Sequence, residues 1–84
     1  MSAAAEKLFL RIKNNPKDVR FRDLCQLAKK FGFVFKGGKG SHRVYGHTGI
    51  KEILNFQDVQ GKVKPYQVKQ FLCIVQRYDL KLEE

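Results

Sequence analysis

The chain has few cysteines, and this scarcity excludes two kinds of small protein. Only two, Cys25 and Cys73, occur among its 84 residues, too few for the small secreted scaffolds that several disulfides hold together. There is no Cys-x-x-Cys or His-Glu-x-x-His spacing and there are only two histidines, which argues against a metal site. Because both cysteines fall in apolar helical stripes, we expect two buried thiols.

Long hydrophobic runs are missing as well. The N-terminal stretch MSAAAEKLFLRIKNN soon reaches charged residues and lacks the sustained apolar core of a signal peptide. No run approaches the roughly 20 apolar residues that a membrane-spanning helix needs. We therefore expect a cytoplasmic protein without membrane contact.

Acidic residues are scarce: 8 Asp and Glu face 17 Lys and Arg, for a net charge of +9. Such a surplus attracts polyanions. No acidic residue occurs between Asp23 and Glu52. That interval contains Lys29, Lys30, Lys36, Lys39, Arg43 and Lys51. A solvated basic surface would also explain the charge, but its placement around a Gly-rich turn favours nucleic acid as the partner.

The residues that are present suffice for one globular domain. A hydrophobic content of 43% with seven Phe supplies a core and argues against disorder. A chain of 84 residues leaves no room for a second core. We expect residues 1–84 to form a single domain, with 1–20 as an N-terminal helix and connection and 21–80 as the core.

Three segments have helical periodicity. Residues 3–13 form the first, which ends before Asn14-Asn15-Pro16 because proline disfavours helical geometry in the preceding residue. The second covers about residues 21–31, with Gly32 as its C-cap. The third begins at Pro65, whose missing N–H costs nothing at the first helical position. The expected apolar stripes are Leu8, Phe9 and Ile12; Phe21, Leu24, Cys25, Ala28 and Phe31; and Val68, Phe71, Leu72, Val75 and Tyr78.

Between the second and third helices the pattern changes to that of strands. Residues 33–36, 41–47 and 52–57 are β-rich, and the first two flank a turn at 37–40, which is typical of a hairpin. Three antiparallel strands need one face covered, and the two longer helical stripes suit that role. The sequence predicts an α+β fold with a three-stranded antiparallel sheet covered on one face by two helices, plus an extra N-terminal helix.

The stretch KGGKGSHRVYGH, residues 36–47, carries the candidate chemistry. A Gly-rich turn presents backbone N–H groups to an anion, and here Lys39 and Arg43 flank it. Cleavage of RNA needs a group that moves protons near neutral pH, and His42 is of that kind. The cations would neutralise the phosphate, and Tyr45 would stack on a base or bond a phosphate.

A purely structural interpretation of this stretch stays open on the residues alone. Gly-Gly-Lys-Gly completes no phosphate-loop motif, and glycines are ordinary turn residues. Ideal alternation places His42 on the face of Val44, where a half-buried structural histidine would lie. His47, beside Gly46 and a turn, is expected at the surface or against RNA rather than as a catalyst.

Gly40-Ser41-His42 is followed by Tyr45, preceded by a helix ending Lys-Lys-Phe-Gly-Phe and followed by a helix start at Lys64-Pro65. This arrangement resembles the HicA family of mRNA-interferase toxins of type II toxin–antitoxin systems, over about residues 21–80. The resemblance implies a double-stranded-RNA-binding-like fold and metal-independent endoribonuclease activity on mRNA, with His42 as the catalytic residue and no cofactor. It also implies a HicB-type antitoxin that suppresses cleavage. The expected RNA-binding residues are Lys36, Lys39, Gly40, Ser41, Arg43 and Tyr45.

Two features depart from the family pattern. The helix at residues 3–13 extends beyond the family core, and the third strand, EILNFQ, is more apolar than the basic or histidine-bearing strand often found there. We therefore assign no second catalytic residue. The alternative function is a non-catalytic RNA-binding module of the same fold, which needs no histidine chemistry. A protein–protein adaptor that uses the N-terminal helix and an exposed strand edge is a third, weaker possibility.

Overall fold

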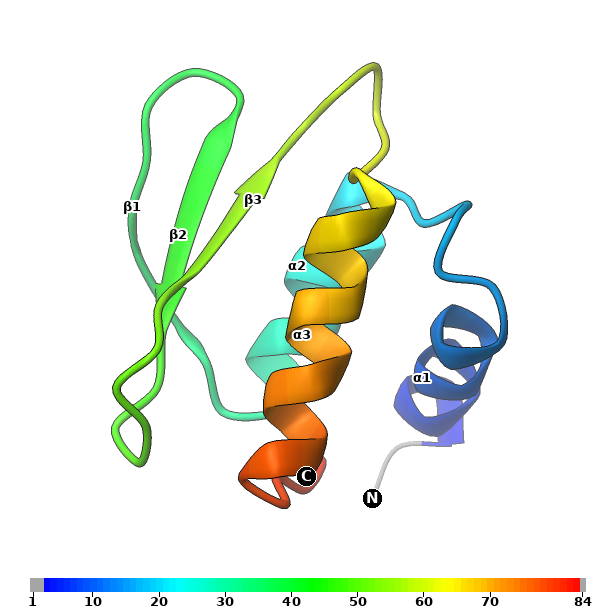
Figure 1. Cartoon of the computed structure of the whole chain (residues 1–84), viewed down its shortest axis with the longest axis vertical. Coiled ribbons are helices and arrows are strands. Elements are labelled where there is room, and N and C mark those ends of the chain that lie inside the picture. Colours follow the sequence, from blue (N-terminus) through cyan, green and yellow to red (C-terminus); the bar gives the residue numbers. More distant parts are fainter. Residues whose placement is uncertain (1–2, 84) are drawn as a thin grey trace.

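The computed structural model describes residues 3–83, which contain three helices and a three-stranded sheet (Figure 1). The helices are α1 (Ala3–Asn14), α2 (Phe21–Lys30) and α3 (Pro65–Arg77). The strands are β1 (Val34–Gly37), β2 (His42–Gly46) and β3 (Leu54–Gln57). The predicted α+β fold, with its extra N-terminal helix, is confirmed. No helix in the described part of the chain is long and apolar enough to cross a membrane.

The sheet is antiparallel in the order β1-β2-β3, and α2 and α3 cover one of its faces (Figure 1). Tyr45 pairs with Leu54, and both are 1% exposed because their side chains point toward the helices. The alternate residues point to the other side, where His42 and Asn55 are exposed. We call this second side the open face.

The end of α2 turns the chain directly into the sheet. The N–H of Phe33 donates to the carbonyl of Ala28 at 3.1 Å, and the N–H of Gly32 donates to that of Lys29 at 3.0 Å. These two bonds, with a φ of 92° at Gly32, are those of a Schellman cap. The predicted C-cap glycine is confirmed, and Phe31 and Phe33 enter the core on either side of it.

Helix α1 adds a third layer, on the side of α2 and α3 that faces away from the sheet (Figure 1). Its Ile12 is 2% exposed and belongs to the same core cluster as the residues of the sheet. The ring of Phe9 contacts that of Phe31 edge to face, with centroids 5.0 Å apart. The predicted apolar stripe of this helix is therefore confirmed, and it packs on the helical layer.

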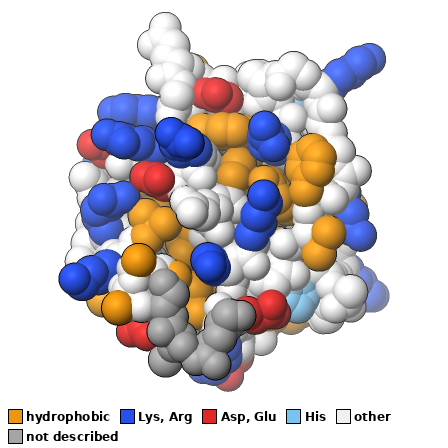
Figure 2. Space-filling view, turned by 180° about the vertical axis from the view of Figure 1, so that it is seen from behind, with side chains coloured by type: hydrophobic (Ala, Val, Ile, Leu, Met, Phe, Trp, Pro, Cys, Tyr) orange, Lys and Arg blue, Asp and Glu red, His pale blue; other side chains and the backbone are white. Residues whose placement is uncertain are grey.

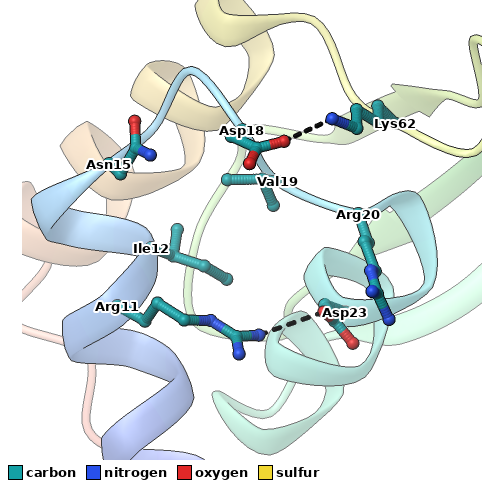
Figure 3. A pocket seen from close by; sticks show the side chains of 8 residues that line it. All are labelled: Arg11, Ile12, Asn15, Asp18, Val19, Arg20, Asp23 and Lys62. Atoms are coloured by element: carbon teal, nitrogen blue, oxygen red, sulfur yellow. Dashed lines mark hydrogen bonds and ion pairs between the residues drawn. The ribbon is translucent and has the colours of Figure 1, made fainter.

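The connection between α1 and α2 borders a polar pocket (Figure 3). Arg11 pairs with Asp23 at 3.2 Å on one side of it, and Lys62 pairs with Asp18 at 2.5 Å on the other. The N–H of Val63 also donates to the carbonyl of Val19 at 3.0 Å. The Arg11 pair joins α1 to α2, and the other two bonds fasten the connection to the segment before α3.

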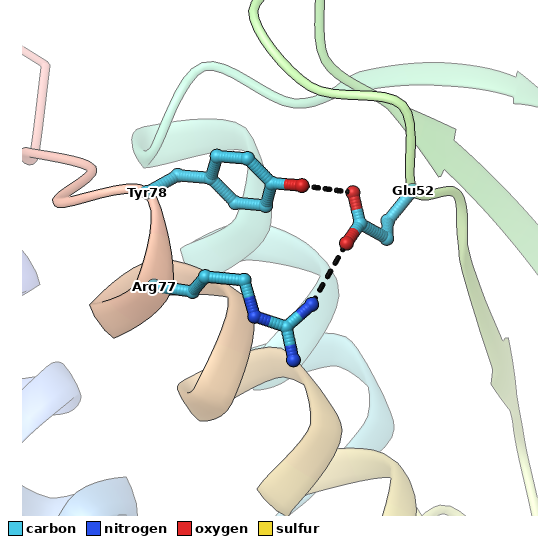
Figure 4. A network of polar contacts seen from close by, with 3 residues as sticks. All are labelled: Glu52, Arg77 and Tyr78. Atoms are coloured by element: carbon cyan, nitrogen blue, oxygen red, sulfur yellow. Dashed lines mark hydrogen bonds and ion pairs between the residues drawn. The ribbon is translucent and has the colours of Figure 1, made fainter.

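At the opposite end of α3, Glu52 links the loop before β3 to the last turn of the helix (Figure 4). The hydroxyl of Tyr78 donates to Oε1 of Glu52 at 2.6 Å, and a guanidinium N–H of Arg77 donates to Oε2 at 2.9 Å. The Tyr78 bond is the main cause of the lowered pKa of Glu52. Glu52 lies outside the sheet, and β3 begins at Leu54, later than expected.

Two predictions about α3 are wrong. Tyr78 is 38% exposed rather than part of the apolar stripe, and Ile74, 3% exposed, fills the core in that turn. Cys73 is exposed. Phe71 and Ile74 point into the core, and the helical period then places Cys73 on the outer side of the helix. Cys25 is buried as predicted.

Candidate active site

His42 is the first residue of β2, and its side chain lies exposed on the open face. No helix in residues 3–83 covers this side of the sheet (Figure 1). The interpretation of His42 as a half-buried structural histidine is therefore wrong, since the face that it shares with Val44 is the uncovered one.

The partner of His42 is Asn55 on β3, whose Oδ1 lies 3.2 Å from Nδ1 of the imidazole. An amide oxygen only accepts hydrogen bonds, so Nδ1 donates and carries the proton. In the neutral ring Nε2 is then the nitrogen that can accept a proton. Sequence analysis missed Asn55, because the alternation of EILNFQ places it on a polar side without giving the register that sets it beside His42.

The Gly-rich turn folds tightly before His42. A Cβ on Gly38 would lie 2.1 Å from the carbonyl oxygen of His42, so only glycine allows this close approach. The N–H of His42 donates to the carbonyl of Lys39 at 3.1 Å, and the N–H of Asp58 donates to that of Ser41 at 2.8 Å. These bonds fix the backbone around the histidine and bring the exposed residues Lys39, Gly40 and Ser41 next to it.

The cations predicted to surround His42 do not all lie on its side of the sheet. Lys36, in a β-bulge between Phe35 and Gly37, extends its stem over Gly46 at the far end of β2. Arg43 points to the covered side, where its guanidinium carbon lies 5.5 Å from the ring centre of Phe35. The prediction that Arg43 neutralises a phosphate held at His42 is wrong, because neighbouring strand residues face opposite ways.

Tyr45 belongs to the core and not to an RNA-binding surface. Its side chain is 1% exposed and contacts the rings of Phe35 and Phe56, with centroids 5.8 and 5.9 Å away. Burial, followed by the neighbouring Cys25 thiol, raises the pKa of Tyr45 to about 12. The prediction that Tyr45 stacks on a base or bonds a phosphate is wrong, because the ring and hydroxyl are enclosed.

The second histidine has a structural position. His47 is half-buried, its ring edge contacts Phe33 with centroids 5.1 Å apart, and its Nδ1 accepts the N–H of Gly49 at 2.9 Å. It stabilises the turn after β2 rather than lying free at the surface as expected. His42 is thus the exposed histidine of the chain.

The open face also presents exposed aliphatic side chains. Val34, which pairs with Gly46, is 54% exposed, and Ile53, which precedes β3, is 61% exposed. The open face therefore has aliphatic side chains and the stem of Lys36 at the end near Gly46, and polar side chains at His42 and Asn55. Within residues 3–83, no group of three His, Cys, Asp or Glu side chains is arranged to hold a metal ion.

The family model described as the HicA toxin of bacterial toxin–antitoxin systems matches residues 21–76, or 56 of the 84 residues. The chain belongs to the HicA toxin family. The match runs from α2 almost to the end of α3 and includes the turn, His42 and Asn55, whereas α1 lies outside it. Membership implies an antitoxin partner. No curated protein and no solved structure gives a significant match.

Proposed function

We propose that this HicA-family toxin is an endoribonuclease that cleaves mRNA through His42 and is inhibited by a HicB-type antitoxin. The observation that carries the proposal is the pairing of an exposed His42 with Asn55. The contact occupies Nδ1 and leaves Nε2 as the ring nitrogen without this partner, within the region that matches the toxin family. Histidine titrates close to neutral pH, as a proton-transfer group in RNA cleavage must.

In this mechanism Nε2 of His42 removes the proton of a ribose 2′-hydroxyl. The 2′-oxygen attacks the adjacent phosphorus, the bond to the 5′-oxygen breaks, and that oxygen takes a proton from water. The hydroxide left behind takes the proton from His42, which restores the base. Asn55 holds the imidazole in the tautomer that accepts the proton, because its oxygen keeps the other proton on Nδ1. No step in this sequence uses a metal ion or a cofactor.

The turn supplies positive charge to the phosphate. Lys39 is bonded through its carbonyl to the N–H of His42 and is exposed, so its ammonium group has access to an anion at the histidine. Backbone N–H groups of the exposed turn at Gly40 and Ser41 add oriented dipoles. Such groups stabilise the charge that builds up on the phosphate as the new bond forms.

A second candidate function is RNA binding without cleavage. The observation that favours it is the set of neighbours of His42 on the open face, which are Asn55, Gln57 and Val44. None of these side chains titrates, so none of them could give a proton to the leaving oxygen. A binding module of this fold recognises the shape and backbone of RNA. It predicts salt-dependent RNA binding with no product.

Expression in a bacterial host tests the proposal. Wild type and His42→Ala are induced to equal soluble levels, and growth is followed together with mRNA integrity. We expect wild type to arrest growth and degrade mRNA, and the variant to do neither. Co-expression of a HicB-type antitoxin should restore growth. Degradation of mRNA by both proteins would refute the role of His42, and RNA binding by two harmless proteins would favour the binding module.

A further inference from the structure

A groove lies on the side of β2 opposite to His42, between α2 and the covered face of the sheet. Arg22 and Lys29 of α2 line one side, and Arg43 of β2 lines the other. Cys25 and Tyr45 close its base. We call this feature the α2–β2 groove. The mechanism proposed above does not use it.

The groove is strongly cationic. Arg22, Lys29 and Arg43 are exposed, and the acidic residue that lines it with them is Asp58. The ion pairs of the described residues are formed elsewhere, by Arg11, Lys62, Arg77 and Lys81. Figure 2, which views the molecule from the α2 side, shows Lys and Arg side chains around exposed hydrophobic groups. The three cations of the groove are therefore available to an anionic ligand.

Arg43 is held in place by two aromatic rings. Its guanidinium carbon lies 6.0 Å from the ring centre of Phe21 and 5.5 Å from that of Phe35. The guanidinium also bonds the hydroxyl of Tyr45 at the base of the groove, and its fork of five N–H donors leaves others for contact with a phosphate. Phe35 is 46% exposed, so part of its ring remains open to a nucleobase.

The arrangement suits RNA better than an acidic protein segment. Arg22 and Lys29 are seven residues apart on α2 and therefore about 10 Å apart along the same side of the helix, so that with Arg43 they form a row of cations that matches a repeating anion. The core side chains of Cys25 and Tyr45 fill the base of the groove, which leaves no apolar pocket for the anchor residue of a protein partner.

We propose that the α2–β2 groove binds the segment of RNA next to the cleavage site. Phosphates contact Arg22, Lys29 and Arg43, and a base stacks on Phe35. The strand passes from His42 over the tip of the β1–β2 hairpin, at Lys39, into the groove. This inference rests on the proposed function, because it assumes that RNA is the substrate at His42.

RNA affinity tests the groove in a His42→Ala background, where no cleavage interferes. The probe is a labelled single-stranded RNA long enough to span both sites. Arg22→Gln with Lys29→Gln is compared with Lys7→Gln with Lys17→Gln, which removes the same charge from α1 and the connection. We expect the groove pair to weaken binding about tenfold and to reduce the slope of log K against log salt by about 1 to 2, and the control pair to change affinity less than about twofold. Equal losses for the two pairs would overturn the proposal.

One substitution at Arg43 separates the contribution of its planar guanidinium group from that of its charge. Arg43→Lys keeps the charge but loses the planar fork, so we expect weaker binding than wild type and a nearly unchanged salt slope. Circular dichroism confirms that each variant is folded. If the groove variants keep their RNA affinity but bind the antitoxin less tightly, the groove is a protein surface and the proposal is wrong.

Cleavage of a trinucleotide distinguishes failure of the groove from failure of the proposed function. The trinucleotide occupies the open face but does not reach the groove, so variants at Arg22 and Lys29 with an intact His42 should cut it at the wild-type rate. If wild type makes no product while the groove variants still lose RNA affinity, the proposed chemistry fails and the groove stands. If cleavage is normal and affinity is unchanged, the groove alone fails.

Discussion

Nδ1 of His42 lies 3.2 Å from Oδ1 of Asn55, across the pairing of β2 with β3. Asn55 comes thirteen residues after His42 in the chain, so only the sheet brings the two together. The contact orients the imidazole and occupies Nδ1, and it leaves Nε2 without this partner. We therefore infer that Asn55 is a positioning residue for His42.

Replacement of Asn55 should slow cleavage and alter its pH dependence. Asn55→Ala removes the acceptor for Nδ1, and we expect the rate to fall about tenfold with RNA affinity unchanged. Asn55→Asp places a carboxylate beside the ring, and a neighbouring negative charge favours the imidazolium form. Because the base form is the active one, the acidic limb of the rate profile should move to higher pH.

Initial rates measured across pH with a short RNA check both variants. Gln57→Ala, on the same side of β3, serves as the control and should keep the wild-type profile. An unshifted acidic limb in Asn55→Asp would contradict a positioning role, since a merely structural residue would change stability and not the profile.

Gln67 should be needed to close the outer edge of β3. Its Oε1 accepts the N–H of Gln57 at 3.0 Å and its Nε2 donates to the carbonyl of Asn55 at 2.9 Å. Gln67→Leu leaves both backbone groups without partners, so we expect the free energy of unfolding to fall by about 1–3 kcal/mol. Amide exchange at Gln57 should accelerate. Gln70→Leu, on the exposed side of the same helix, should change neither the stability nor the exchange rate. Equal effects of the two substitutions would refute this role of Gln67.

Helix α1 should contribute to the stability of the domain although it lies outside the family match. Ile12 is 2% exposed and packs in the common core, so Ile12→Ala should lower the free energy of unfolding by about 2–4 kcal/mol. Leu10, which is 56% exposed on the same helix, provides the matched control Leu10→Ala. Urea denaturation checks both variants. If Ile12→Ala unfolded at the same urea concentration as wild type, α1 would be an appendage rather than part of the domain.

The contact between Tyr78 and Glu52 should make stability depend on pH. The Tyr78 hydroxyl holds the pKa of Glu52 below its ordinary value, so the contact stabilises the fold above that ordinary value and loses its effect as pH falls through the lowered one. Tyr78→Phe should therefore have a lower free energy of unfolding than wild type at neutral pH, and this difference should become smaller in acid. Carboxyl chemical shifts should show the pKa of Glu52 rising in Tyr78→Phe. Tyr66→Phe, at a 63% exposed tyrosine, should leave that pKa unchanged, and the same pKa in all three proteins would contradict the account.

Most of the fold could be predicted from the sequence because its signals are local. Helical periodicity, Gly32 as a cap and Pro65 as a first helical residue each act within a few positions, and the structure confirms them. The identity of the candidate histidine was also readable, since a Gly-rich turn and the strand after it are adjacent in the chain. Alternation left the direction of the strand open, and only the packing of the helices decides which side is covered.

Contacts between distant segments could not be predicted. The helices cover the side of β2 that carries Tyr45 and Arg43, so Tyr45 is buried and Arg43 lies against α2. His42 is on the other side and stays exposed. Asn55 and Gln67 act through the register of β3, which depends on long-range pairing. Tyr78 fits a helical stripe by spacing, yet it lies at the end of α3 and bonds Glu52 instead.

Cleavage of a labelled RNA by the purified protein, in buffer with a metal chelator, tests the central claim most directly. Wild type and His42→Ala are compared at equal concentration, after circular dichroism has shown that both are folded. The account predicts that wild type cuts the RNA and that His42→Ala is slower by about 10² to 10⁴-fold. Cleavage by His42→Ala at the wild-type rate, or the absence of any product from wild type, would contradict it.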